Sequence, residues 1–266
     1  MSTTATPYER ARPPHPRPHR PGLRSLMIMV RAEATMVARD PAGLITPLGL
    51  PVLILLTSAS SASQEVITAG RTALDLYVMP LVTVMVLTFI GVLNMPSFLA
   101  YYRRSGILRR FAVTPVSPLM VLVAQVIVSI LQSLLGIGLA LAVAAIVFDV
   151  NPPLHLGAAL GVLVLCAAAM YSAGMIVAAI APTPSSAVAI GLVGFLGLGA
   201  VGGMFGGRDA LPDPVAAIGA HLPFGAGVEA LSAAWAGQAV PVGSLLSLTI
   251  TLVLGIVIAA ALFRWD

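Results

Sequence analysis

The sequence predicts an all-α, polytopic membrane protein with six transmembrane helices. Of its 266 residues, 58% are hydrophobic and only 9% are charged, whereas a soluble domain of this length would carry about a quarter charged residues. Several apolar runs are longer than the roughly 18 residues that indicate a membrane-spanning helix. The charged residues gather in short segments between these runs. Most of the chain is therefore expected to lie in the bilayer.

The chain begins with a basic, proline-rich arm, Met1–Gly22. It has almost no apolar side chains to bury, so we expect it to be disordered or extended. Leu23–Arg39 follows, with apolar residues at helical spacing on one face and arginines on the other. This pattern is typical of an amphipathic helix that lies in the membrane interface, and Asp40-Pro41 is expected to end it.

Six apolar runs of sufficient length follow, and we expect each to form one transmembrane helix. Their ranges are Gly43–Ser63, Leu76–Ala100, Leu119–Phe148, Leu156–Ala181, Ser185–Gly206 and Val242–Phe263. The outer stretch Arg208–Gln238 is too apolar for an ordinary loop and contains three prolines. It predicts two half-length re-entrant helices, Pro214–His221 and Gly227–Trp235, on the outer side of the membrane.

The arginines determine the predicted orientation, because cytoplasmic segments carry an excess of basic residues. If both termini are cytoplasmic, the inner side holds seven arginines before the first span, four in Tyr101–Pro118, and Arg264. Arg71 and Arg208 then lie outside. Twelve of the fourteen arginines are thus inside, which predicts six spans with both termini in the cytoplasm.

The segment Tyr101–Pro118 is the most strongly charged interruption of the apolar sequence. Each arginine in it would cost about 2.5–3.5 kcal/mol at the centre of a membrane helix, so the segment must leave the bilayer. These arginines are Arg103, Arg104, Arg109 and Arg110. Ile107–Val113 is compatible with a short amphipathic helix that Thr114-Pro115 would end. From the residues alone, this helix could bind a partner protein or could belong to a basic loop without one.

The same loop contains the run Gly106-Ile107-Leu108-Arg109-Arg110-Phe111, followed by Thr114-Pro115-Val116-Ser117-Pro118. It resembles the cytoplasmic loop of ABC-2 type permeases, the membrane subunits of ATP-binding-cassette exporters. Arg39-Asp40-Pro41 and Leu222-Pro223-Phe224 are also similar to that family, and the resemblance covers about Leu23–Asp266. The family often has a glutamate before the glycine, where this chain has Arg103-Arg104-Ser105.

The resemblance implies that different subunits carry out transport and ATP hydrolysis. A coupling helix would dock on a separate ATPase subunit, and its residues would be Gly106, Ile107, Leu108, Arg109, Arg110 and Phe111. Two copies of that ATPase would bind Mg-ATP, and this chain would hold no cofactor and no metal. A second permease chain, identical or different, would complete a dimer around a central route through the membrane.

The resemblance also implies export across the plasma membrane of a bacterium, since the compact form resembles actinobacterial drug and antibiotic exporters. The expected cargo is a hydrophobic drug or antibiotic, which would give the chain a role in antibiotic resistance. Export of a lipid or polysaccharide is the nearest alternative. The alternative of a different class is an ion-coupled carrier or a channel that works alone.

Composition excludes several kinds of chemistry. The sequence has no lysine, and a phosphate-binding P-loop requires one, so we expect ATP hydrolysis in another chain. The single cysteine, Cys166, excludes a disulfide framework and a cysteine metal cluster. No span centre carries the acid or base that ion-coupled transporters usually use. The arginine placement accounts for the pI of 9.8 without a nucleic-acid partner.

Polar residues within the spans are candidates for a substrate route. Gln125, Ser129, Gln132 and Ser133 share one helical face of the third span, and Asn94 lies in the second. They could line the route, or they could hydrogen-bond between helices, which in membranes contributes about 0.6 kcal/mol for each bond.

Two residues of the outer segment, Phe224 and Glu229, are candidates for an outer gate. The alternative for an aromatic residue at this depth is an anchor in the membrane interface, which is the commoner use.

Overall fold

The computed structural model describes residues 22–61, 66–68, 70–104 and 118–262, most of which lie in helices. The helices are α1 (Leu23–Arg39), α2 (Pro41–Ser61), η1 (Leu74–Val78), α3 (Met79–Thr88), η2 (Phe89–Asn94), α4 (Met95–Arg104), α6 (Pro118–Phe148), α7 (Leu156–Ile180), α8 (Pro184–Val201), η3 (Arg208–Ala210), α9 (Asp213–His221), α10 (Pro223–Trp235) and α11 (Val242–Leu262). The N-terminal arm up to residue 21 lies outside the described residues.

Six helical segments of the described chain are long and apolar enough to cross a membrane. They are α2, the continuous stretch Leu74–Arg104, α6, α7, α8 and α11. The predicted all-α fold with six spans is therefore confirmed. Before them, α1 covers Leu23–Arg39, the range that the amphipathic pattern predicts.

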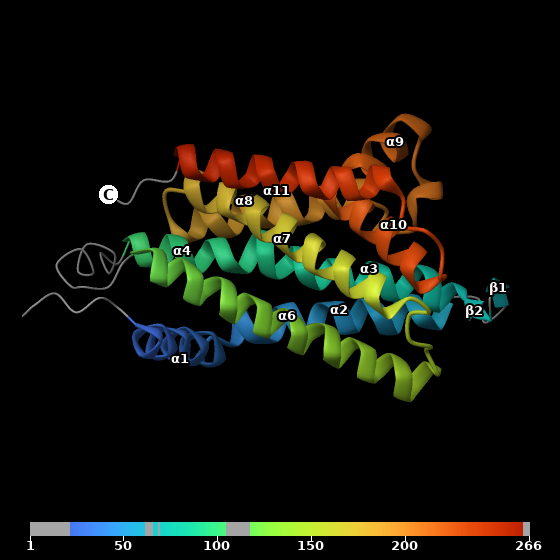
Figure 1. Ribbon diagram of the computed structural model, residues 1–266, viewed down its shortest axis with the longest axis horizontal. Helices are drawn as coiled ribbons and strands as arrows, with labels where there is room; N and C mark the ends of the chain where they lie inside the picture. The colour runs from blue at the N-terminus through green and yellow to red at the C-terminus, as the bar shows by residue number, and fades with distance from the viewer. Residues whose placement is uncertain (1–21, 62–65, 69, 105–117, 263–266) are drawn as a thin grey trace, which may run out of the picture.

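The second span, Leu74–Arg104, is the core of the bundle. Its most apolar window is 89% buried, whereas the windows of the other five spans are 17% to 44% buried. It consists of η1, α3, η2 and α4 in succession. Because α3 is hydrophobic on all sides, it is stable where other helices surround it. The helices α2, α6, α7, α8 and α10 pack around this span, and α11 lies against α7 (Figure 1).

The π-helical turn η2 brings the second span into backbone contact with α7. A Cβ atom added to Gly91 in η2 would lie 2.9 Å from the carbonyl carbon of Met170. From the opposite side, a Cβ atom added to Gly174 would overlap the carbonyl oxygen of Gly91. Only a residue without a Cβ atom allows two membrane helices to approach this closely.

The fifth span is shorter than Ser185–Gly206, the range that the sequence predicts. The helix α8 ends at Val201, because the glycine-rich stretch after it forms turns. Gly203 and Gly207 have φ angles of 93° and 81°, and glycine adopts this left-handed conformation without the penalty of a Cβ atom. The end of α8 packs tightly against this turn, since a Cβ atom on Gly199 would lie 2.9 Å from the Met204 sulfur.

A short hairpin, which the sequence did not predict, precedes the second span. Its strands β1 (Val66–Thr68) and β2 (Arg71–Thr72) pair in antiparallel fashion. The buried carboxylate of Asp75 accepts hydrogen bonds from the backbone N–H groups of Thr72, at 3.1 Å, and Asn151, at 2.8 Å. Asp75 therefore holds the hairpin to the turn that follows α6.

The segment between α8 and α11 contains the two predicted short helices, α9 and α10, which meet at an angle of 78°. The second of them starts at Pro223 and not at Gly227, since proline is favoured in the first turn of a helix. Most residues of α10 are buried, and the helix packs against α3, α7 and α11. Their re-entry into the membrane stays a prediction.

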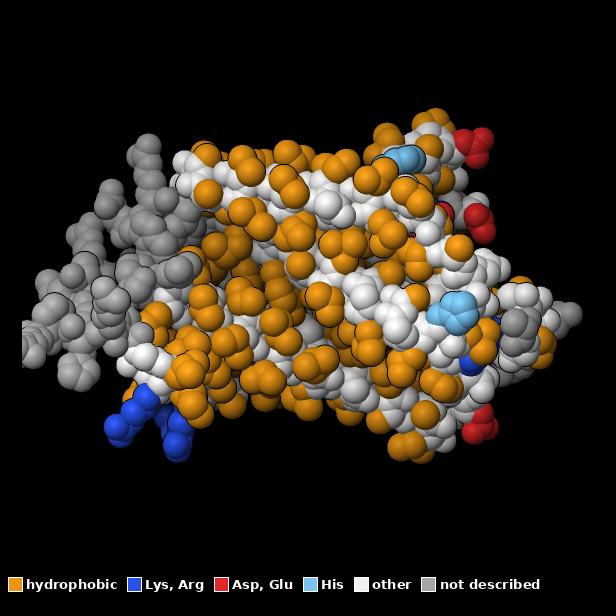
Figure 2. Space-filling model, in the orientation of Figure 1, with side chains coloured by type: hydrophobic (Ala, Val, Ile, Leu, Met, Phe, Trp, Pro, Cys, Tyr) orange, Lys and Arg blue, Asp and Glu red, His pale blue; other side chains and the backbone are white. Residues whose placement is uncertain are grey.

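Charged side chains lie at the two ends of the bundle and leave a hydrophobic surface between them (Figure 2). Arginines gather at the end where α1 lies, and acidic side chains gather at the end that carries the hairpin and α9 (Figures 1 and 2). The start of α1 and the end of α11 share the arginine-bearing end (Figure 1). In the predicted orientation this end faces the cytoplasm, and that orientation stays a prediction.

Candidate functional site

A cavity of about 970 Å³ opens at the acidic end of the bundle. The start of the second span, the turn after α8 and the helix α10 enclose it. Its lining combines apolar side chains with charged ones, and includes Tyr77, Leu81, Met204, Arg208, Val228 and Glu229. This volume lies at the upper end of the range for sites that bind drug-sized ligands.

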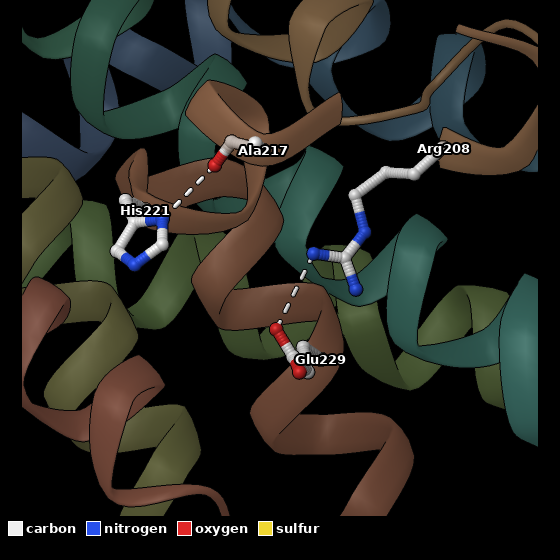
Figure 3. A network of polar contacts seen from close by, with 4 residues as sticks. All are labelled: Arg208, Ala217, His221 and Glu229. Atoms are coloured by element: carbon white, nitrogen blue, oxygen red, sulfur yellow. Dashed lines mark hydrogen bonds and ion pairs between the residues drawn. The ribbon is translucent and has the colours of Figure 1, made fainter. Parts of the chain in front are cut away.

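An ion pair at the cavity connects the stretch after α8 to α10 (Figure 3). Nη1 of Arg208 donates to Oε2 of Glu229 at 3.3 Å. The side chains are 31% and 36% exposed, so the pair is expected to contribute less than about 1 kcal/mol and to weaken with salt. His221 takes no part in this pair, since its Nδ1 lies 2.9 Å from the carbonyl oxygen of Ala217. The connection can therefore open at little cost.

The two predicted gate residues lie in different environments. Glu229 lines the cavity, whereas Phe224 is fully buried. The Phe224 ring lies against Gly202, in the turn after α8. Of the two, Glu229 is the one that a molecule in the cavity would contact, and the role of either residue as a gate stays a prediction.

Asn94 and Gln132, two of the predicted route residues, form a hydrogen-bonded cluster in the other half of the bundle. The Asn94 side chain in η2 donates to Oε1 of Gln132 in α6 at 3.0 Å, and to the carbonyl oxygen of Gly43 in α2 at 3.0 Å. The Gln132 amide donates to the same Gly43 oxygen at 2.6 Å. Three spans are therefore joined at one buried backbone carbonyl.

The other polar residues of the third span are also buried. The Tyr171 hydroxyl of α7 donates to the Ser129 carbonyl oxygen at 3.1 Å and lies 2.7 Å from the Ser133 hydroxyl. Gln125 is only 2% exposed, and its Oε1 has no hydrogen-bond partner among the residues that the structure describes. The contacts of Asn94, Gln132 and Ser133 support the interpretation that these side chains join helices, and a substrate route along them stays a prediction.

A double-mutant cycle tests the Asn94–Gln132 contact. We expect Asn94→Ala and Gln132→Ala to show a coupling of about 0.6 kcal/mol in the free energy of unfolding, the average for hydrogen bonds between membrane helices. Titration with a denaturing detergent measures it. Thr249→Ala is the control partner, since the Thr249 hydroxyl bonds to Leu245 of its own helix, and no coupling to Asn94→Ala is expected. Altered cargo preference with unchanged stability would contradict the structural role.

At the arginine-bearing end, α1 packs against the second and third spans. Val37 of α1 lies in one apolar cluster with Phe98 of α4 and Val128 of α6. The Arg103 guanidinium donates to the Ala181 carbonyl oxygen at the end of α7. The helix α4 ends just before the predicted coupling helix, whose residues lie outside the described ones: Gly106, Ile107, Leu108, Arg109, Arg110 and Phe111.

A family model described as ABC-2 type transporter matches residues 24–236. The chain belongs to the ABC-2 type transporter family. Its membership implies that the chain is a membrane component of an ABC transporter and that an ABC ATPase is its partner. The matched residues extend from α1 to the end of α10, and they include both the arginine loop and most of the outer cavity. A comparison with curated proteins finds no match.

Two side chains of this ABC-2 permease form polar contacts that the sequence did not predict. Arg208 entered only the count of outer arginines, although it pairs with Glu229. Tyr171 lies in an apolar run, where a tyrosine hydroxyl by itself signals a polar partner on another helix. The identity of both partners depends on how the helices pack, and no spacing in the sequence encodes it.

Proposed function

We propose that this ABC-2 permease exports a hydrophobic, drug- or antibiotic-like molecule, driven by a separate ATPase subunit. The observation that carries the proposal is the course of the second span. Its first turns, with Tyr77 and Leu81, line the outer cavity, and its last helix ends just before the predicted coupling loop. Because close-packed neighbours surround this span, a displacement of one end is transmitted to the other.

In the proposed cycle, ATP binding closes an ATPase dimer, and Ile107–Phe111 transmits the closure to the spans on either side. Two ATPase copies and a second permease chain, identical or different, complete the transporter in a bacterial plasma membrane. The weak Arg208–Glu229 pair opens as the outer cavity releases its cargo. The mixed lining of that cavity supports an amphipathic hydrophobic cargo, as in antibiotic resistance by export.

Co-purification and transport test this proposal together. The tagged permease, co-expressed with its ATPase, should retain the ATPase through purification, and the reconstituted complex should hydrolyse ATP faster when a hydrophobic drug is present. An ATPase whose P-loop lysine is replaced is the matched control, and it should support no transport.

Two outcomes would contradict the proposal in different ways. Drug movement by the permease alone, driven by an ion gradient, would identify a carrier and remove the ATPase from the mechanism. Stimulation and transport by a phospholipid but by no drug would keep the ATPase and replace the cargo with a lipid.

A further inference from the structure

The helix α1 carries an acidic side chain on the face that packs against the bundle. Glu33 is 2% exposed, although glutamate is almost never fully buried without a partner. Helical spacing places Glu33 on the same face as Met29 and Val37. Val37 packs with α4 and α6 in one apolar cluster, and Met29 packs against Tyr102 and Val121 in another. Glu33 is therefore surrounded by apolar contacts from three helices.

The contact between α1 and α6 contains two buried oxygen acceptors without a donor in the described part of the chain. They are Oε2 of Glu33 and Oε1 of Gln125. Gln125 lies on the same face of α6 as Val121 and Val128, the two residues that pack toward α1. A carboxylate only accepts hydrogen bonds, whereas a protonated carboxyl group also has one O–H donor. Protonation of Glu33 would thus remove a charge from this contact and supply one O–H donor, which either Gln125 or the Tyr102 oxygen could accept.

Glu33 also forms a hydrogen bond with Tyr102. The Tyr102 hydroxyl also donates to the Met36 sulfur at 3.2 Å. A hydroxyl has one hydrogen to donate and can accept as well. With Glu33 neutral, the acid can donate to the Tyr102 oxygen while Tyr102 donates to Met36. With Glu33 ionised, Tyr102 has to give up one of these two contacts.

We propose that Glu33 is a positioning residue that holds α1 against the end of the second span in its neutral, protonated form and releases α1 when it ionises. Tyr102 lies in α4, the helix that leads into the predicted coupling loop. The Glu33–Tyr102 contact would therefore determine whether α1 moves together with that loop. The effect of the contact on coupled transport rests on the proposed function, whereas the protonation and the docking of α1 do not.

The surrounding charges are compatible with a neutral Glu33. Neither α2 nor α6, the two long helices against which α1 packs, contains a charged or titratable side chain. The helix α4 contributes Tyr101, Tyr102, Arg103 and Arg104, and of these Tyr102 contacts Glu33. The arginines of α1 itself, Arg24, Arg31 and Arg39, are exposed. Burial raises the pKa of Glu33 from its ordinary value of 4.5, and this effect outweighs the hydrogen bond between Glu33 and Tyr102, which lowers the pKa.

The direction of this pKa shift determines the pH dependence. Docking of α1 is strongest below pH 4.5, where Glu33 is protonated whether α1 is docked or free. As the pH rises toward the raised pKa of the docked state, the undocking equilibrium should increase by up to about tenfold for each pH unit. Above that pKa the dependence should cease.

The protonation is tested by NMR titration of the full chain labelled with ¹³C at its glutamate carboxyl groups. The chain has four glutamates, and the resonance lost in Glu33→Gln identifies Glu33. We expect this resonance to titrate above the ordinary glutamate range. A midpoint at pH 4.5 or lower would overturn the proposal, since it would mean that a cation or water stabilises the carboxylate.

Docking is tested by hydrogen exchange in α1, compared between the full-length wild type and Glu33→Gln. Glutamine keeps the shape of the neutral acid and cannot ionise, so α1 should stay protected at every pH in the variant and lose protection with rising pH in the wild type. Protection that changes equally with pH in both proteins would overturn the proposal. In the complex with its ATPase, Glu33→Gln should flatten the pH profile of drug-stimulated hydrolysis; an unflattened profile beside altered exchange would refute only the link to transport.

Discussion

Gly174→Ala is expected to destabilise the chain by about 3 kcal/mol, the largest single-site effect that we predict. The new methyl group would overlap the carbonyl oxygen of Gly91, in the buried second span. Overpacking of a core commonly costs 1–3 kcal/mol when side chains can adjust. Here the obstacle is backbone in a π-helical turn, so the value should lie at the upper end of that range. The midpoint of thermal unfolding and the yield of monodisperse protein measure the effect.

Gly161→Ala is the matched control, because Gly161 lies in the same helix, α7, and a Cβ atom there has no neighbour within 4 Å. Alanine in a helix interior is more stable than glycine by about 0.5–1 kcal/mol, so this variant should be neutral or slightly stabilised. If the two variants unfold at the same midpoint, then η2 and α7 do not approach each other as closely as described.

Reversing the charges of Arg109 and Arg110 to glutamate is expected to abolish cargo-stimulated ATP hydrolysis in the reconstituted complex. The two residues are the cationic part of the predicted coupling helix, and the double substitution changes its net charge by four units. Truncating one partner of a buried charge pair at an interface costs about 2–5 kcal/mol. A loss of at least tenfold in stimulated activity should result, and hydrolysis assays with and without drug measure it.

The control for this experiment is the same charge change in the N-terminal arm, at Arg10 and Arg12. Both positions are predicted to be cytoplasmic, so the orientation rule is perturbed to a similar degree, while the coupling helix remains intact. Stimulation should survive in the arm variant. Full stimulation in the Arg109/Arg110 variant, with the complex still assembled, would show that the ATPase is coupled through another contact.

Much of the fold follows from the sequence because the bilayer allows few alternatives. Each backbone polar group in hydrocarbon must be paired within the protein, so a long apolar run can only be a helix. This is why the bounds of most spans are close to those predicted. The helix Leu23–Arg39 was recognised from a different pattern, an apolar face opposite a face with arginines. The one large error, at the end of α8, arose where glycines adopt left-handed turns inside an apolar run.

The contacts and the burial of the candidate site residues were harder to predict from the sequence. The polar residues Asn94 and Gln132 were identified from their spacing, but their shared partner, the Gly43 carbonyl, is a backbone atom that no pattern marks. Phe224 was placed in the right segment, yet it is buried rather than exposed to the cavity. Glu33 was overlooked, because a glutamate in an amphipathic helix is normally part of its polar face.

By itself, the sequence determined the number of spans, their helical state, the arginine loop and, through its motifs, the family. The tertiary structure alone decided that Leu74–Arg104 is the central helix, that Arg208 reaches Glu229, and that Glu33 is buried. The physical reason is that lipid tails are as apolar as leucine side chains. An apolar residue facing lipid therefore looks the same in sequence as one facing another helix, and only packing distinguishes them.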